Sequence, residues 1–350
     1  MNRVALKALA VEMLAIAAAL GLTFGATAGE AAPRYHIAHE VPLPGEEGWD
    51  YLAFEQGGHR LFVSHGTRVL VFDTDTLKVI GEIADTQGVH GIALAPDLGR
   101  GYISAGRANL IVVFDLKTLA RLTEIKTTGE GPDAILYDPS SHRVFSFNGH
   151  GRNVTAVDAV TNTVLGTIAL DAKPEFAVTD GKGHVYVNLE DKNSLAVIDP
   201  AHLAVTSVWP LAGCDEPSGL AIDTARGYLL PACGNKVMAV VEASSGKVLG
   251  TAPIGDGVDA ADFDPATGLA FASCGEGVLT VLKAGKAGRP EVVETVKTQH
   301  GARTMALDRA THRVFLVTAN FGPPPAATPE HPHPRGAMLP GSFRLLVLEP

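Results

Sequence analysis

The chain lacks the features that mark several large functional classes. It has no basic surplus, because 28 Lys and Arg stand against 38 Asp and Glu and give a formal net charge of −10. Non-specific binders of nucleic acid or of anionic membranes need basic surfaces, so neither class is expected. The sequence contains no Gly-x-Ser-x-Gly elbow, no Walker loop and no dinucleotide fingerprint between a strand and a helix. It also has no Cys-x-x-Cys-His motif, which excludes covalent attachment of a c-type haem.

Helical periodicity is scarce after the first 30 residues. The chain instead has 38 glycines and 22 prolines among its 350 residues, together with an apolar content of 46%. Short apolar runs bounded by Gly, Pro and Asp are typical of strands joined by tight turns. The composition therefore predicts a globular all-β protein with a large core.

One unit of structure is repeated along the chain. Residues 257–282, GVDAADFDPATGLAFASCGEGVLTVL, hold three short apolar runs separated by two turns, and a fourth run follows at 291–296. Seven copies of four strands each, spaced by about 42 residues, predict a seven-bladed β-propeller with four-stranded antiparallel blades. The seventh copy supplies only three strands. We therefore expect the amino-terminal strand, 35–41, to complete the last blade and to protect its edge.

Three segments carry a family resemblance: 213–223 (GCDEPSGLAID), 255–277 (GDGVDAADFDPATGLAFASCGEG) and 298–336 (TQHGARTMALDRATHRVFLVTANFGPPPAATPEHPHPRG). Through them, residues 35–350 resemble the YVTN or YncE-like family of secreted seven-bladed propellers. The Gly-His…Trp-Asp pattern of WD40 repeats is absent. The resemblance implies a single propeller domain over 35–350. It implies no particular chemistry, since members of that family share no single activity.

The first residues have the pattern of an export signal. Arg3 and Lys7 precede an apolar run at 13–24, and Ala26-Thr27-Ala28 forms a small-residue cleavage site. We therefore predict a signal peptide over 1–28, with an uncleaved membrane anchor as the alternative. No later segment is long and apolar enough to span a membrane, so the mature chain is expected to have no membrane span. The predicted location is periplasmic or secreted, where disulfides form.

The residues that begin the first strands of the seven copies are the candidates for a site. Antiparallel blades place the links into the first strands on the same face as the turns between second and third strands. The aligned residues should therefore ring one mouth of the central channel: Asp50, His90, Asp133, Glu175, Ser218, Asp259 and Arg303. Converging carboxylates repel one another or hold a cation, which predicts a site for a polar ligand or a divalent cation. The structural alternative is that each carboxylate accepts hydrogen bonds from loop N–H groups.

Histidine residues extend this prediction. The predicted ligand-binding set at the mouth is Asp50, His90, Asp133, Glu175, Asp259, His300 and Arg303. Histidine combined with carboxylates suits a transition metal, and the predicted metal ligands within the set are Asp133, Glu175, Asp259 and His90. Two further histidines in turns on this face, His65 and His150, are expected to be solvated turn residues.

The three cysteines suggest one disulfide. Cys214 lies in the link into the fifth unit and Cys233 in a later turn of the same unit, so both fall on the mouth face. Pairing of Cys214 with Cys233 is the favoured use in an exported protein. The alternatives are a bridge between Cys233 and Cys274, or a thiolate metal site with neighbouring histidine.

A proline-rich insertion departs most from the repeat. Residues 321–341, FGPPPAATPEHPHPRGAMLPG, contain seven prolines and the pair His331 and His333. A long loop inside a compact domain is usually functional or disordered. We expect either a lid or partner-docking segment over the mouth, or a stiff surface loop.

The leading hypothesis is an exported, non-catalytic, monomeric propeller that binds a small molecule, a metal ion or an envelope protein at the mouth. The alternative is a lactonase or hydrolase that uses a divalent cation to polarise a carbonyl and to activate water. In that version Asp133, Glu175 and Asp259 would hold the cation. His90 or His300 would act as acid or base, with Arg303 as the oxyanion partner. A third reading is a purely structural interaction platform.

Overall fold

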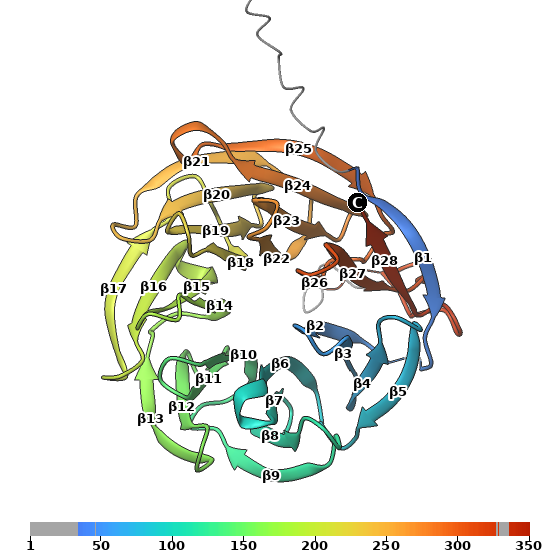
Figure 1. Cartoon of the computed structure of the whole chain (residues 1–350), viewed down its shortest axis with the longest axis horizontal. Coiled ribbons are helices and arrows are strands. Elements are labelled where there is room, and N and C mark those ends of the chain that lie inside the picture. The colour runs from blue at the N-terminus through green and yellow to red at the C-terminus, as the bar shows by residue number, and fades with distance from the viewer. Residues whose placement is uncertain (1–33, 46, 327, 329–335) are drawn as a thin grey trace, which may run out of the picture. The chain divides into compact units, whose positions relative to one another are not determined.

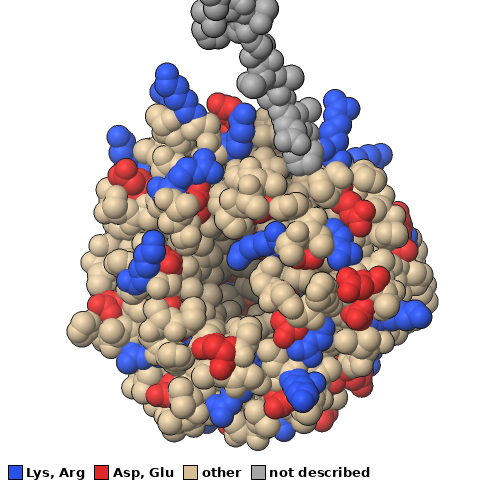
Figure 2. All heavy atoms as spheres, viewed as in Figure 1, with Lys and Arg blue, Asp and Glu red and all other residues tan. Residues whose placement is uncertain are grey.

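Seven antiparallel sheets form a ring (Figure 1), and the face drawn in Figure 2 is hollowed at its centre. The computed structural model describes residues 34–45, 47–326, 328 and 336–350, and residues 34–350 form one compact unit. The prediction of an all-β, seven-bladed propeller is confirmed. The expected signal peptide, 1–28, lies outside the described residues. Within the described part of the chain, no helix is long and apolar enough to cross a membrane.

The first three blades follow chain order, each running from the channel outward. Their strands are β2 (Trp49–Glu55), β3 (Arg60–His65), β4 (Arg68–Asp73) and β5 (Lys78–Ile83); β6 (Val89–Ala95), β7 (Arg100–Ala105), β8 (Leu110–Asp115) and β9 (Arg121–Lys126); and β10 (Pro132–Asp138), β11 (Arg143–Asn148), β12 (Asn153–Asp158) and β13 (Thr163–Ala169). A single turn of 3₁₀ helix, η1 (Pro96–Leu98), joins β6 to β7.

Blades four to six repeat this order. Their strands are β14 (Pro174–Thr179), β15 (Val185–Leu189), β16 (Ser194–Asp199) and β17 (Ala204–Pro210); β18 (Pro217–Asp223), β19 (Tyr228–Cys233), β20 (Val237–Glu242) and β21 (Val248–Pro253); and β22 (Val258–Asp264), β23 (Leu269–Cys274), β24 (Val278–Ala284) and β25 (Pro290–Lys297). Two more 3₁₀ turns, η2 (Glu190–Lys192) and η3 (Lys286–Gly288), lie in the connections.

The seventh blade joins the two ends of the propeller. It contains β26 (Met305–Asp308), β27 (Arg313–Thr318) and β28 (Arg344–Glu349), and the outer strand is β1 (His36–Pro42). β1 pairs antiparallel with β28, so that His36 lies opposite Glu349 and Pro42 opposite Arg344. The two strands lie side by side at the rim in Figure 1. The closure expected from the three-stranded seventh copy is confirmed.

Apolar residues on both faces of the middle strands hold neighbouring blades together. In β8, the run Ile111, Val112, Val113 and Phe114 is buried throughout. Successive side chains of a strand point to opposite faces, so each middle strand contributes to two cores. Phe62 of blade one meets Phe114 of blade two with ring centroids 5.9 Å apart. This packing gives the channel a rigid wall and fixes the inner strands that carry the candidate site.

Candidate functional site

The seven aligned residues, called the ring residues below, occupy equivalent places around the channel. In six blades the ring residue is the second residue of the inner strand; these residues are Asp50, His90, Asp133, Glu175, Ser218 and Asp259. Arg303 lies two residues before β26. The links before the inner strands are hydrogen-bonded to the turns between second and third strands, as Gly66 N–H to Gly48 O (2.8 Å) and Gly275 N–H to Gly257 O (2.8 Å) show. Both sets of loops therefore lie on one face, the mouth face.

A β-bulge accompanies the ring residue in each of these six blades. In blade three, Pro132 lies opposite Asn148 and Ile135 opposite Ser146, so three steps on the inner strand match two on its neighbour. The same kind of register shift occurs in the other five. A bulge re-aims the side chains beside it. The ring residue and its successor are thus released from strict alternation between the two sheet faces.

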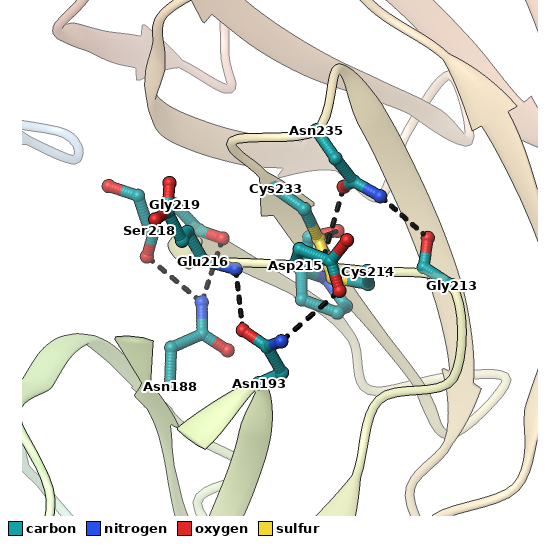
Figure 3. The surroundings of a disulfide bond; sticks show 11 residues. Asn188, Asn193, Gly213, Cys214, Asp215, Glu216, Ser218, Gly219, Cys233 and Asn235 are labelled. Carbon is teal, nitrogen blue, oxygen red and sulfur yellow. Dashed lines mark hydrogen bonds between the residues drawn. A yellow bond between two sulfur atoms is a disulfide. The ribbon is translucent and has the colours of Figure 1, made fainter. Parts of the chain in front are cut away.

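Buried polar side chains on the second strands pin the backbone at these bulges. Ser104 accepts a hydrogen bond from Gly91 N–H (2.8 Å) and donates to the carbonyl of Asp133 in the next blade. Ser273 donates to the carbonyl of Arg303 (2.5 Å). Asn188 donates to the carbonyls of Ser218 and Gly219 (Figure 3). The sequence analysis missed this role, although one polar residue within an apolar strand was a signal that could have revealed it.

Three ring residues come together on one side of the mouth. His90 Nδ1 lies 2.6 Å from Asp50 Oδ2 and 3.5 Å from Asp133 Oδ1. The hydrogen bond with Asp50 raises the pKa of His90, while burial opposes that rise. Burial raises the pKa of Asp133 to about 6, and the charge of His90 counteracts part of the effect.

Glu175 faces a different partner. Lys173 Nζ lies 2.7 Å from Glu175 Oε1 and also pairs with Glu190. Burial and the charge of Asp133 raise the pKa of Glu175 to about 8, against the influence of Lys173. Burial opposes the charge on Lys173, but hydrogen bonds to Glu175 and Glu190 outweigh it and raise the lysine pKa.

Arg303 joins the other side of the ring. Its guanidinium lies 3.1 Å from Asp259 Oδ2 and 3.8 Å from Asp50 Oδ1. Ser218 Oγ is 3.2 Å from Asp259 Oδ1. The four ring carboxylates are between 12% and 26% exposed, so they face a space that water enters only in part.

The structure therefore groups the candidate metal ligands differently from the prediction. Among the described residues, the structure brings together metal-binding atoms of Asp50, His90 and Asp133, all within 4.8 Å of one another. Glu175 and Asp259 do not belong to this group, since each faces a cation on its own side of the ring. Spacing along the repeat could not show this division, because it depends on which cationic side chain reaches each carboxylate.

An aromatic pair crosses the channel one residue deeper than the ring. In five units the residue after the ring residue is small or short, namely Gly91, Ala134, Gly219, Ala260 and Thr304. Blades one and four have Tyr51 and Phe176 instead, and these rings stack with centroids 4.5 Å apart and an interplanar angle of 19°. Their strands, β2 and β14, lie on opposite sides of the channel (Figure 1). The stack therefore obstructs the channel, and the ring residues above it form a cup, the mouth cup.

The hydroxyl of Tyr51 is buried and makes no hydrogen bond to any described residue. Burial raises its pKa, and so do the charges of Asp133, Glu175, Asp50 and Asp259. The phenol thus lies within the field of all four ring carboxylates. Nothing in the sequence analysis singled out Tyr51, although its alignment with five small residues was visible.

A cavity of about 1510 Å³, the side cavity, opens beside the mouth between blades six, seven and one. Arg303 and His300 line it, together with the apolar residues Trp49, Val258, Ala319, Phe321, Pro324 and Met338 and the polar residues Asp256, Glu276, Gln299 and Arg344. Arg303 also belongs to the ring, so the side cavity and the mouth cup share this residue. His300, predicted to lie with the ring residues, is an exposed residue of this cavity.

The described ends of the proline-rich insertion frame the side cavity. Phe321 and Met338 form an isolated bridge, and Gly322 N–H donates to Ala337 O (2.8 Å). The insertion therefore leaves and rejoins the blade beside the mouth. His331 and His333 lie outside the described residues.

Cys214 and Cys233 are joined in a disulfide, with Cα atoms 5.4 Å apart, and Cys274 is a buried free thiol. This is the pairing favoured by the sequence analysis. In Figure 3 the disulfide lies beside the link into blade five, where Asn193 Oδ1 accepts from Glu216 N–H (2.8 Å) and Asn235 Oδ1 from Asp215 N–H (3.1 Å). The link is thus tied down at several points immediately before Ser218.

One histidine prediction was wrong. His65, expected to be solvated, has a fully buried side chain that packs on Phe343 with centroids 4.6 Å apart. Its Nδ1 lies 3.0 Å from Glu47 Oε2, and burial lowers the histidine pKa. The imidazole at the end of β3 is therefore packed against Phe343 of blade seven and is not solvated. His150 is exposed, as expected.

Comparisons with known proteins find no matching family model and no matching curated protein. Among solved structures, the chain is similar to U3-55K (TM-score 0.73, 9% identity, covering 87% of this chain and 97% of that one). It is also similar to the WD40 repeats of RRP9 (0.75, 10%, 90% and 100%). A third neighbour is hydrazine synthase of Kuenenia stuttgartiensis (0.67, 18%, 78% and 93%). At these identities the likeness shows the propeller fold alone.

Proposed function

We propose that this chain is an exported propeller that binds a small polar molecule, without catalysis, in the mouth cup and the side cavity. The observation that supports this most strongly is that Arg303 both lines the side cavity and pairs with Asp259 of the ring. Ligand pockets commonly measure roughly 300–1,000 Å³, so a cavity of about 1510 Å³ has room for an organic molecule. The Tyr51–Phe176 stack means that a ligand would enter and leave by the mouth face.

The lining of the side cavity favours a molecule with an apolar body and charged or polar ends. Trp49 and Phe321 present aromatic surface, with ring centroids 5.9 Å apart, and Met338 adds a flexible apolar contact. Arg303 and Arg344 supply guanidinium donors nearby. Apolar walls with a few charged groups at fixed places are the usual composition of small-molecule sites.

Export and the YVTN or YncE-like resemblance belong to the same proposal. The amino-terminal charge and apolar pattern and the Cys214–Cys233 disulfide support a periplasmic or secreted location. We infer that the chain binds no nucleic acid, because the net charge is −10 and both signs are interspersed over the face in Figure 2. The proposal also takes the chain to be a monomer. An envelope protein is the alternative partner, and the proline-rich insertion would be its docking segment or a lid.

Two arginines provide a matched test. Arg303 pairs with Asp259 at 3.1 Å on the mouth face, and Arg309 pairs with Asp262 at 3.0 Å in the turn at the other end of the same blade. The measurement is native mass spectrometry of the full chain purified from the cells that make it. We expect a bound small molecule that Arg303→Ala loses and Arg309→Ala keeps. A ligand retained in Arg303→Ala, lost equally in both variants, or absent from the wild type would contradict the proposal.

A hydrolase is the second candidate, and the Asp50–His90 pair favours it. A carboxylate held 2.6 Å from Nδ1 orients an imidazole so that Nε2 is left to act as acid or base. His90 is 39% exposed at the mouth, so a substrate could reach it. Hydrolysis of lactones and esters by the wild type, abolished in His90→Ala and kept in Arg309→Ala, would favour this candidate over simple binding.

A further inference from the structure

The group formed by Asp50, His90 and Asp133 has donor atoms at separations that suit a small cation. The distances from His90 Nδ1 are 2.6 Å to Asp50 Oδ2 and 3.5 Å to Asp133 Oδ1. Zinc binds imidazole nitrogen and carboxylate oxygen at roughly 2.0–2.2 Å, which keeps two such donors roughly 3–3.5 Å apart. The first observed separation is shorter than that span, and the second lies at its upper end. Small side-chain shifts would therefore bring the three donors to a common centre.

The local structure holds the backbone of two of these residues in place. Asp50 N–H donates to Ser64 Oγ (3.1 Å), and the carbonyl of Asp133 accepts from Ser104. Both residues are the second of an inner strand and lie beside a β-bulge. A metal site gains affinity when its ligands are fixed before the ion arrives, because less ordering is needed on binding.

A second observation points to a ligand at the same place. The Tyr51 hydroxyl is buried without a hydrogen-bond partner among the described residues, and Tyr51 directly follows Asp50 in the chain. A buried hydroxyl left unpaired costs about 1–3 kcal/mol. A cation that arrives with bound water would bring an oxygen able to accept this hydrogen bond.

We propose that Asp50, His90 and Asp133 form a transition-metal site in the wall of the mouth cup, suited to Zn²⁺. Ca²⁺ and Mg²⁺ prefer sets made of oxygen atoms alone, whereas an imidazole nitrogen among two carboxylates suits the later divalent metals. Three protein ligands leave a coordination position for water or for a bound molecule. The inference rests on the proposed function, since the metal would anchor a polar end of the small molecule bound in the mouth cup.

The ring offers its own matched control. Asp259 is a ring carboxylate of similar exposure to Asp50, 17% against 19%, but it faces Arg303 rather than His90. Zn²⁺ would be titrated into the chelator-treated full chain at constant pH and followed by calorimetry, with Co²⁺ absorption as a second readout. We expect one Zn²⁺ per chain that requires His90. In His90→Ala the affinity should fall on the order of 100-fold, and Asp259→Asn should bind within about threefold of the wild type.

Circular dichroism of each variant would establish that it is folded. Absence of Zn²⁺ binding in the wild type, unchanged binding in His90→Ala, or equal losses in His90→Ala and Asp259→Asn would overturn the metal site. The two proposals can fail separately. A small molecule that is captured and depends on Arg303, in a protein that binds no Zn²⁺, leaves the proposed function standing and removes the metal.

Discussion

At the scale of single residues, the electrostatics of the mouth depend on the side chain with which each ring residue pairs. His90 contacts both Asp50 and Asp133. Glu175 pairs with Lys173, and Asp259 pairs with Arg303. These contacts divide a ring of like charges into separate groups, each with its own cation or histidine. Such a division lets four partly buried carboxylates coexist in one mouth without a large net repulsion.

The unpaired hydroxyl of Tyr51 leads to a prediction about the free energy of unfolding. Tyr51→Phe removes a buried group that has no hydrogen-bond partner, so we expect the free energy of unfolding of the ligand-free chain to rise by about 1 kcal/mol. The matched control is Tyr102→Phe, since the Tyr102 hydroxyl donates to Ala159 O at 2.8 Å, and this change should lower stability by about 1 kcal/mol. Urea unfolding measures both. Equal destabilisation by the two changes would show that Tyr51 has a partner.

The free thiol of Cys274 is expected to be inert in the folded protein. It is buried, and burial raises its pKa to about 12, while the thiolate is the form that reacts. A thiol reagent at pH 8 should modify no cysteine in the native chain and one cysteine after unfolding without reductant. Rapid modification of the native protein would contradict the burial of Cys274 or the Cys214–Cys233 disulfide.

Sequence alignment of the repeats located the ring residues but could not assign their partners. Position within a repeat sets depth along the channel, so Asp50 and Asp259 were correctly expected at one level. Partner choice depends on which charged side chain reaches each carboxylate, and the repeat alignment did not include Lys173, two residues before Glu175. Tyr51 and Phe176 could have been found, because they replace small residues at an aligned position.

At the scale of elements, the bulged inner strands require backbone to approach backbone. A Cβ on Gly219 would lie 2.7 Å from Ala261 N and 2.8 Å from Ala260 C in the next blade. Neither atom is the end of a flexible side chain, so the blades would have to separate. The bulges themselves could not be predicted, because an extra residue in a strand leaves the apolar pattern of the repeat nearly unchanged.

Gly219→Ala should therefore destabilise the protein by about 1–3 kcal/mol, the usual cost of overpacking. Gly48 provides the control, since a Cβ there meets nothing within 4 Å and its backbone is not left-handed. Gly48→Ala should change the free energy of unfolding by less than about 0.5 kcal/mol. Urea unfolding measures both variants. Equal stability of Gly219→Ala and Gly48→Ala would contradict the close packing inferred at Gly219.

At the scale of the whole molecule, β1 closes the ring by covering the edge of β28. The sequence predicted this closure because the seventh repeat was one strand short. A chain that begins at Leu43 would leave the edge of β28 unpaired, and exposed edges pair with other chains. We expect this chain to aggregate or to elute as larger species in gel filtration, and to unfold at lower urea concentration than a chain that begins at Arg34. Identical elution and stability of the two would contradict the role of β1.

Closure, the aromatic stack and the side cavity together support the proposal that a ligand binds at the mouth face. The closed ring fixes the inner strands, the Tyr51–Phe176 stack obstructs the channel beneath the ring, and Arg303 of the ring lines a cavity of about 1510 Å³. The fold neighbours share the scaffold at 9–18% identity, so the functional proposal rests on the residues of this chain and not on those neighbours.

The most direct test of that proposal is a crystal structure of the full chain purified from the cells that make it, at a resolution that shows bound molecules. The account predicts ligand density between Trp49 and Arg303 that extends into the mouth cup above Tyr51. A molecule that native mass spectrometry detects on the protein, but whose density lies on the opposite face or at the outer strands, would contradict it.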